Sequence, residues 1–471
     1  MPKYTTLKAI QADIQLGKTN CVALVDHYLD AIEQSENLNI YVEVFTDEAR
    51  HRAFELDKKY RKNPHSVGRL FGAVVSLKDV ICYANHEVTA GSHILRGFRS
   101  VFSATAVERI LAEDAIIIGR TNCDQFAMGS DNTNTIYGAV RNAADAERVA
   151  GGSSGGAAVS VQADTCLVAL GSDTGGSVRQ PADFCEVIGT KPTYGRISRH
   201  GLLAYGSSFD QIGTLSHSVE DAALFLEIMA GADDFDSTAS QKEVDAYTKN
   251  LHDSPSKYKI AYFDKALNTN GLDADIREIN VKMLDILRGV GHTVEAVDFE
   301  YLDYVVPAYY VLTTAEASSN LSRFDGVRYG YRAENVHTLE ETYRKSRTEG
   351  FSDEVKRRII LGTFVLSSGY YDAYYTKAQK ARRLVADRLS AIFAEYDFII
   401  MPVSPVKPWK IGEKSEDPVA MYLADIYTVL ANLAGIPAIA LGKQHCQFMA
   451  AKWEEGKLMA FAQEVEQLRN F

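Results

Sequence analysis

The chain has 471 residues, 46% of them hydrophobic and 24% charged, which is typical of a globular protein with a sizeable core. Its formal net charge of −12 argues against a general phosphate-binding surface, because nucleic-acid-binding surfaces are basic. No apolar run reaches the roughly 18 residues of a membrane span, so the sequence predicts none.

The first 65 residues are predicted to be mainly helical. Apolar side chains recur at helical spacing over 5–35, a strand is predicted at 39–45, and a charged helix follows to about Lys62. Short apolar strands then alternate with helices, with strands predicted at 72–77, 115–119 and 166–171 and a helix at 104–113. This alternation predicts an α/β fold with a mixed, mainly parallel central sheet covered by helices on both faces.

The second half of the chain is predicted to complete the same sheet. A polar stretch from about Ala232 to Ser256 is expected to be a surface excursion. Beyond it, strands are predicted at 258–262, 293–297, 397–401 and 436–441, with one helix between the first two strands and two helices over 353–395.

Two glycine-framed serines carry the strongest chemical signal. Ser153 lies in GGSSGG at 151–156, and Ser177, 24 positions later, ends GSDTGGS at 171–177. Glycine lets backbone N–H groups approach a reacting atom closely. Upstream, Lys78 follows the apolar strand at 72–77. Burial lowers the pKa of a lysine, and a neutral lysine can accept a proton from serine. The pattern therefore predicts serine nucleophilic catalysis with a lysine base.

These three motifs, in this order, resemble the amidase signature family. The resemblance implies that Lys78 is the base, Ser177 the nucleophile, and Ser153 the bridge between them, following a cis Gly152–Ser153 peptide bond. It also implies that an oxyanion is stabilised by the backbone N–H groups of Thr174, Gly175, Gly176 and Ser177.

Two other interpretations use the same residues. The loop at 151–155 satisfies G-x-S-x-G, the nucleophile elbow of α/β-hydrolases, which would make Ser153 the nucleophile. An elbow follows a strand, but 145–150 is not strand-like, and this interpretation leaves Lys78 unexplained. For Lys78 itself, the simple alternative is a surface ion pair with its neighbour Asp79.

Residues 309–328 and 354–375 resemble a narrower group, the A subunits of bacterial glutamyl-tRNA(Gln)/aspartyl-tRNA(Asn) amidotransferases. That resemblance implies a glutamine pocket in which Arg358 binds the α-carboxylate, Asp425 binds the α-amine and Tyr309 closes the site. The amide end is expected to be lined by Met128, Gly129 and Ser130. Arg357 beside Arg358, and Tyr310 beside Tyr309, remain alternatives at this point.

The resemblance implies a glutaminase that passes ammonia to a partner. It implies no cofactor in this chain, whereas the assembled complex uses ATP and Mg. The implied partners are the B and C subunits of a heterotrimer, in which tRNA is bound mainly by the former. A stand-alone amidase acting on small or fatty amides is one alternative. A non-catalytic scaffold is another, because the segment after Leu441 is shorter than in the family.

The family pattern makes the whole chain, 1–471, one amidase domain. Its expected parts are a helical region at 1–65, a signature core at 66–231, the excursion at 232–257, and a second half at 258–471. Six scattered cysteines without a Cys-x-x-Cys pair favour reduced thiols and argue against zinc. No metal is therefore expected. No signal peptide is recognisable at the start, so a cytoplasmic protein is expected.

Overall fold

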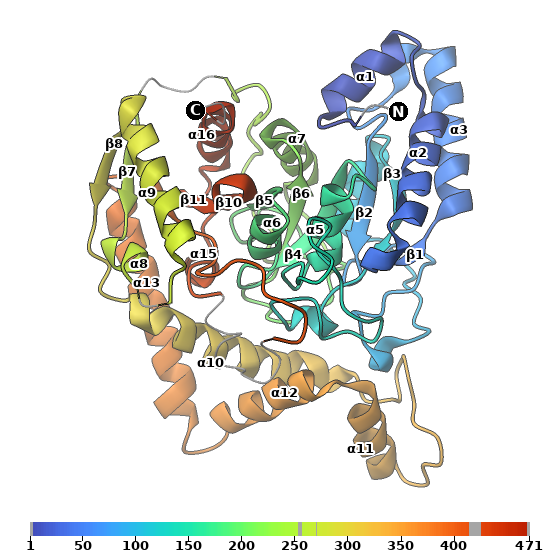
Figure 1. Ribbon diagram of the computed structural model, residues 1–471. Coiled ribbons are helices and arrows are strands. Elements are labelled where there is room, and N and C mark those ends of the chain that lie inside the picture. The colour runs from blue at the N-terminus through green and yellow to red at the C-terminus, as the bar shows by residue number, and fades with distance from the viewer. Residues whose placement is uncertain (1–2, 253–256, 270, 414–424, 469–471) are drawn as a thin grey trace.

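The computed structural model describes residues 3–252, 257–269, 271–413 and 425–468. A single 11-stranded sheet runs through these residues in the order β1-β3-β2-β4-β6-β5-β10-β11-β9-β7-β8 (Figure 1). The strands are β1 (Tyr41–Val44), β2 (Val74–Lys78), β3 (Ile116–Thr121), β4 (Val168–Asp173), β5 (Ile188–Lys191), β6 (Gln211–Ser216), β7 (Lys259–Tyr262), β8 (Thr293–Ala296), β9 (Phe398–Pro402), β10 (Ala438–Leu441) and β11 (Cys446–Met449).

The α/β class and the mixed sheet are confirmed, but the expectation of mainly parallel pairing is wrong. Six strand pairings are antiparallel and four are parallel, the parallel ones being β2–β3, β2–β4, β7–β8 and β7–β9. The centre of the sheet, from β4 through β6, β5, β10 and β11 to β9, is antiparallel throughout. One cause is the tight turn at 442–444, which makes β10 and β11 a hairpin rather than a crossover.

Helices cover both faces of this sheet (Figure 1). They are α1 (Leu7–Gln15), α2 (Cys21–Gln34), α3 (Thr46–Lys62), α4 (Thr105–Ala112), α5 (Gly155–Gln162), α6 (Arg179–Phe184), α7 (Val219–Met229), α8 (Asp264–Leu267), α9 (Ala274–Gly289), α10 (Leu302–Asn320), α11 (Leu339–Gly350), α12 (Asp353–Val365), α13 (Lys377–Phe393), α15 (Val429–Ala434) and α16 (Glu455–Gln467). The short turns are η1 (Glu36–Leu38), η2 (Pro64–Ser66), η3 (His93–Leu95), η4 (Gln125–Ala127), η5 (Leu321–Arg323), η7 (Gly442–Gln444) and the π-helical η6 (Tyr371–Thr376).

The predicted elements that carry the site are present. The strand before Lys78 is β2, and the strand before the second serine loop is β4, which extends to Asp173. The stretch at 5–35 with helical apolar spacing forms two helices, because Gly17 adopts φ +69° between them and Asn20 caps the second. The expected strands at 397–401 and 436–441 are β9 and β10.

Helices α10 and α12 pack against each other across one end of the sheet (Figure 1). A Cβ atom added to Gly362 of α12 would lie 2.0 Å from the Thr314 carbonyl oxygen of α10, so this close approach requires glycine.

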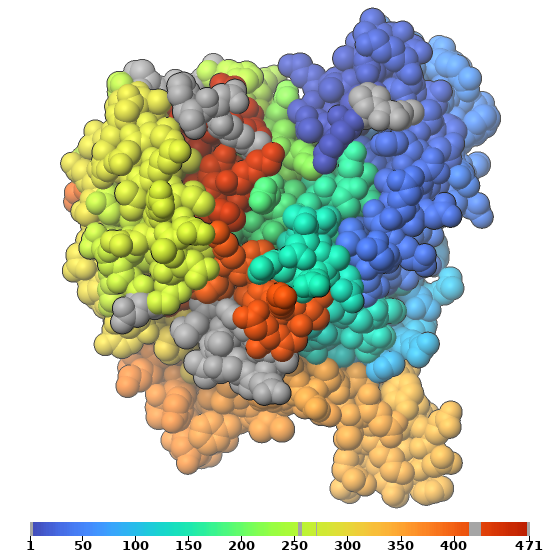
Figure 2. Space-filling view, in the orientation of Figure 1, coloured from blue at the N-terminus to red at the C-terminus, as the bar shows by residue number. Residues whose placement is uncertain are grey.

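The C-terminal segments lie between the two halves of the chain, as the red atoms of Figure 2 show. All six cysteines are buried free thiols. None of the described helices is long and apolar enough to cross a membrane.

Candidate active site

Lys78 lies at the carboxyl end of β2 and is fully buried. Its Nζ atom is surrounded by three serine hydroxyls, 2.7 Å from Ser153 Oγ, 2.9 Å from Ser154 Oγ and 2.9 Å from Ser172 Oγ. Asp79 instead pairs with Arg120, so the surface ion pair weighed from the sequence is not formed. The lysine is therefore held by neutral groups inside the protein.

Burial lowers the pKa of Lys78 to about 8, although Cys123 and nearby carboxylates, among them Asp124 and Asp173, favour its charged form. Desolvation disfavours the ammonium because the interior solvates a charge poorly. A substantial fraction of the lysine is consequently neutral at the pH of a cell and can accept a proton.

Ser153 follows a cis Gly152–Ser153 peptide bond, as the family resemblance implies. The backbone here is tightly enclosed, because a Cβ atom on Gly152 would lie 2.2 Å from Asp124 Oδ2. Gln180 Oε1 accepts the Gly152 N–H at 2.9 Å. The preceding residues, 145–150, form only isolated bridges and no strand, so the structural setting of a nucleophile elbow is absent at this point of the chain.

Ser177 lies in the loop between β4 and α6 and is 9% exposed. Asp173, the last residue of β4, accepts N–H groups from this loop: Gly176 N donates to Oδ1 at 2.9 Å and Val178 N to Oδ2 at 3.2 Å. Of the four amides expected at the oxyanion, that of Gly176 is thus already bonded. Within the described residues, the backbone N–H groups of the other three, Thr174, Gly175 and Ser177, donate no hydrogen bond.

Arg179 holds the loop of Ser177 in place through Asp173. Its guanidinium binds both oxygens of Asp173, each at 3.1 Å, and both side chains are fully buried. Burial alone would raise the pKa of Asp173, but the ion pair with Arg179 lowers it to about 2. Arg179 also donates to Asn432 Oδ1 of α15 and to Gln447 Oε1 of β11, both at 2.7 Å. The loop that carries Ser177, the predicted nucleophile, is therefore held by the last quarter of the chain.

Arg358 and Asp425 lie in one buried cluster, 5% and 9% exposed. Tyr310 joins them: its ring faces the Arg358 guanidinium at 5.5 Å and its hydroxyl donates to Asp425 Oδ2 at 3.3 Å. Ser130 Oγ also donates to Asp425 Oδ2, at 2.8 Å. Burial raises the pKa of Asp425 to about 7, against the opposing effects of Ser130, Arg358 and Tyr310. The structure thus brings together a cation and a carboxylate in a shielded place.

Arg358, not Arg357, faces inward. Arg358 donates to Tyr205 Oη and to Glu354 Oε1, both at 2.8 Å, whereas the side chain of Arg357 is 51% exposed. Tyr309 and Tyr310 are both buried and take different positions. The Tyr309 hydroxyl lies directly on the nucleophile loop, since a Cβ atom on Gly175 would lie 2.3 Å from it.

The loop at 128–130 connects the two parts of the site. Met128 is fully buried, and Gly129 lies against Asp124, whose Cγ would be 2.3 Å from an added Cβ atom. Gln180 Nε2 donates to the Ser130 carbonyl oxygen at 2.9 Å, so one side chain holds both this loop and the Gly152 amide. The position of Met128 at the amide end of a substrate stays a prediction.

A protein-family model described as Amidase matches residues 23–458. The chain belongs to the amidase family. It is 45% identical over 472 residues to the A subunit of the glutamyl-tRNA(Gln) amidotransferase of Prosthecochloris aestuarii (98% of this chain, 99% of that one) and 47% identical over 477 residues to that of Chlorobium chlorochromatii (99% of each). The corresponding protein of Thermotoga maritima shares the fold with TM-score 0.77 and 36% identity over 94% of this chain and 91% of that one. A peptide amidase of Stenotrophomonas maltophilia gives TM-score 0.82 at 26% identity, over 99% and 97%.

Several side chains that shape this amidase site were not predicted from the sequence. They are Ser154, Ser172, Asp173, Arg179, Gln180, Tyr205 and Glu354. Five of them lie inside or within three residues of the two serine motifs, so proximity to the motifs could have drawn attention to them. Nothing in the sequence singles out Tyr205, which reaches Arg358 from a loop 153 positions away.

No group of three His, Cys, Asp or Glu side chains that could hold a metal ion occurs in the described part of the chain.

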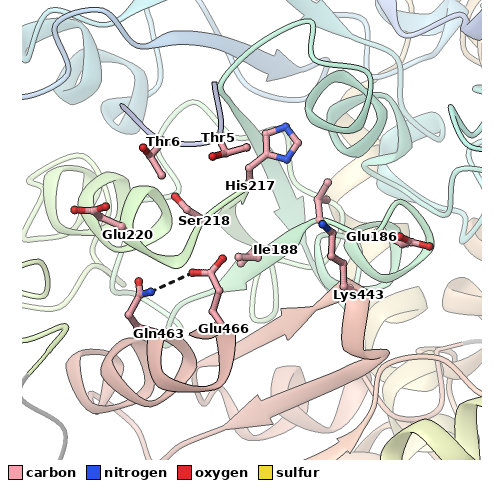
Figure 3. Close-up of a pocket in the computed structure, with 12 residues that line it drawn as sticks. Thr5, Thr6, Glu186, Ile188, His217, Ser218, Glu220, Lys443, Gln463 and Glu466 are labelled. Atoms are coloured by element: carbon pink, nitrogen blue, oxygen red, sulfur yellow. Dashed lines mark hydrogen bonds between the residues drawn. The ribbon is translucent and has the colours of Figure 1, made fainter. Parts of the chain in front are cut away.

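A separate surface hollow of about 290 Å³ lies where the N-terminal segment, α7 and α16 meet (Figure 3). Its lining includes Glu220, Glu466 and Lys443 but none of the predicted site residues. The candidate catalytic groups lie elsewhere: Lys78 at the end of β2, Ser153 in the loop before α5, and Ser177 in the loop between β4 and α6.

The pKa of Lys78 predicts how the reactivity of Ser177 depends on pH. Sulfonylation of Ser177 by phenylmethylsulfonyl fluoride should speed up as pH rises through about 8, because only neutral Lys78 accepts the proton. Below that pH the rate should fall about tenfold per unit. Lys78→Ala should label at least about 100-fold more slowly and lose this dependence. Equal labelling rates in acid and in alkali would contradict a lysine base.

Proposed function

We propose that this chain is a glutaminase, the A subunit of a glutamyl-tRNA(Gln) amidotransferase. The observation that carries the proposal is the buried Arg358–Tyr310–Asp425 cluster beside the nucleophile loop. A guanidinium binds a carboxylate and a carboxylate binds an ammonium, so the cluster suits the two charged ends of a free amino acid. A simple amide substrate has no use for such a pair. The full-length relatives named as A subunits support the same assignment.

In the proposed mechanism, Ser177 gives its proton to Ser153 Oγ as Ser153 passes its own to neutral Lys78 Nζ, 2.7 Å away. Ser177 Oγ bonds to the side-chain carbonyl carbon of glutamine, and the backbone amides of Thr174, Gly175 and Ser177 stabilise the oxyanion, because that of Gly176 is bonded to Asp173. Each such donor lowers a barrier by about 2.7–4 kcal/mol. The C–N bond then breaks, the proton returns through Ser153 to the leaving nitrogen, and ammonia departs. Water finally cleaves the acyl-enzyme to glutamate.

In the substrate complex, Arg358 holds the α-carboxylate of glutamine and Asp425, seated by Ser130, its α-ammonium. Tyr309 covers the amide end at Gly175, with Met128 and Gly129 in the adjoining loop. We further propose that the ammonia is used by the B subunit, which binds most of the tRNA. Together with the C subunit it completes a cytoplasmic heterotrimer that uses ATP and Mg. The whole chain, 1–471, acts as one amidase domain in this proposal.

A stand-alone amidase is the second candidate. The fold likeness to the peptide amidase of Stenotrophomonas maltophilia favours it, because a similar fold there belongs to an enzyme named for hydrolysing peptide amides. Rapid turnover of simple amides together with indifference to glutamine would select this candidate.

Replacing the proposed nucleophile tests the division of labour. In a complex with the B and C subunits from the same host, Ser177→Ala should abolish glutamine-dependent amidation of Glu-tRNA(Gln), because no acyl-enzyme forms. Added ammonium chloride should restore amidation to the wild-type rate, because the partner's chemistry is intact. Amidation that ammonia fails to restore would show that this chain does more than release ammonia.

The adjacent arginines form a matched pair for testing substrate binding. Arg358→Lys should raise the KM for glutamine about 10- to 100-fold, since a hydrogen bond to a charged group contributes about 1.5–3 kcal/mol and lysine lacks the planar fork. Arg357→Lys, on the exposed side of the same helix, should change it less than about twofold. Similar effects from both substitutions would remove Arg358 from the pocket.

Asp425 predicts a pH dependence of glutamine affinity that is separate from that of Lys78. Calorimetric binding to the Ser177→Ala protein isolates affinity from catalysis. Because only the ionised carboxylate binds an ammonium, the Kd should rise up to about tenfold per unit as pH falls below about 7. Asp425→Asn should bind weakly at every pH. A Kd that does not change across this range would refute the role of Asp425.

A further inference from the structure

Exposed apolar side chains gather on α12 and the π-helical η6. Of the nineteen large apolar residues that are exposed in the described chain, eight lie between 360 and 384. Five of these define what we call the α12–η6 face: Ile360 (69% exposed), Leu361 (41%), Phe364 (41%), Tyr370 (44%) and Tyr374 (43%). Monomeric proteins rarely expose contiguous apolar surface without a binding role. The face lies at the lower side of the molecule in Figure 1, where α12 runs below α10.

The five side chains form one continuous surface. The ring of Phe364 lies 4.3 Å from that of Tyr370 and 5.8 Å from that of Tyr374, measured between centroids. Ile360 and Leu361 precede Phe364 by four and three positions on α12 and so share its side of the helix. Turns of π-helix such as η6 are frequent at functional sites. The aromatic rings are therefore held in place by one another before any partner arrives.

The excess positive charge beside this face comes from two lysines, in a chain of net charge −12. The other six lysines and arginines of residues 353–393 pair with carboxylates or, like Arg382, donate to groups inside the protein. Lys377 and Lys380, at the start of α13, are exposed, and no described carboxylate lies within ion-pairing distance of either. A surface that carries carboxylates around an apolar centre would satisfy both properties.

The α12–η6 face lies directly behind the glutamine pocket. Arg358 points inward from α12, while Ile360 and Phe364 point outward from the same helix. Gly362 keeps α12 against α10, which carries Tyr309 and Tyr310. One helix thus has a substrate-binding side and an open apolar side, and a molecule bound outside would lie one helix diameter from the substrate.

We propose that the α12–η6 face is the docking surface for a protein partner whose apolar contact area is rimmed by aspartate and glutamate. Tyrosine and phenylalanine are enriched where proteins bind one another, which favours a protein over a lipid surface. The net charge of −12 also opposes binding to an anionic membrane. Two copies of this face would bring like charges together. The choice of the B subunit for this role rests on the function proposed above.

The test compares two equally exposed apolar positions. Ile360→Asp and Phe364→Asp should each weaken binding of the full chain to the purified B and C subunits at least about tenfold, because a carboxylate is placed in an apolar contact opposite other carboxylates. Leu16→Asp, 68% exposed on the distant N-terminal region, should change the Kd less than about twofold. Lys377→Glu should weaken binding more at low than at high salt. The Kd is measured by titration calorimetry at two salt concentrations.

Equal Kd values for Ile360→Asp and Leu16→Asp would overturn the proposal, as would failure of the wild-type chain to bind the B and C subunits. So would Ile360-dependent dimerisation seen by sedimentation, or Ile360-dependent binding to vesicles of phosphatidylglycerol and phosphatidylcholine. Glutamine hydrolysis by the isolated variants should equal that of the wild type. If the wild-type chain docks normally but never hydrolyses glutamine, the proposed function fails while the docking surface stands.

Discussion

The buried ion pair between Asp173 and Arg179 is the interaction on which the rest of the site depends. It links the end of β4 to the loop of Ser177, and through Asn432 and Gln447 it attaches that loop to α15 and β11. Removing one partner of such a pair would leave an uncompensated charge inside the protein, at a cost of about 3–5 kcal/mol. The geometry of the nucleophile loop is therefore determined by elements that are more than 200 residues away in sequence.

Lys78, unlike Arg179, is buried without a hydrogen-bonded carboxylate partner among the described residues. Arg179 is buried with a counter-charge, whereas Lys78 is buried among the hydroxyls of Ser153, Ser154 and Ser172. Hydroxyls can donate to or accept from an amine, so they tolerate both its protonation states, and desolvation then lowers the lysine pKa. This contrast explains how Arg179 keeps its charge and its position, whereas Lys78 is suited to gaining and losing a proton.

The pairing of α10 with α12 places the residues proposed to bind the substrate beside the loop of Ser177. Tyr309 lies on the nucleophile loop and Tyr310 on Asp425, since successive side chains of a helix point about 100° apart and can serve two neighbouring groups. The same geometry turns Arg358 inward and Arg357 outward on α12. Because the outer side of α12 is apolar and exposed, the proposed substrate and the proposed protein partner would bind to opposite sides of this one helix.

Local patterns in the sequence were sufficient for the α/β class, the strands before Lys78 and the second serine loop, and the two serine motifs, because these are set by short-range hydrophobic periodicity and glycine content. They were insufficient for strand direction in the centre of the sheet, where pairings such as β5 with β10 join distant segments. Choosing between Arg357 and Arg358, and finding Tyr205, likewise needed the tertiary structure. Which side of a helix is buried, and which distant hydroxyl reaches a guanidinium, is decided by packing between elements rather than by neighbours along the chain.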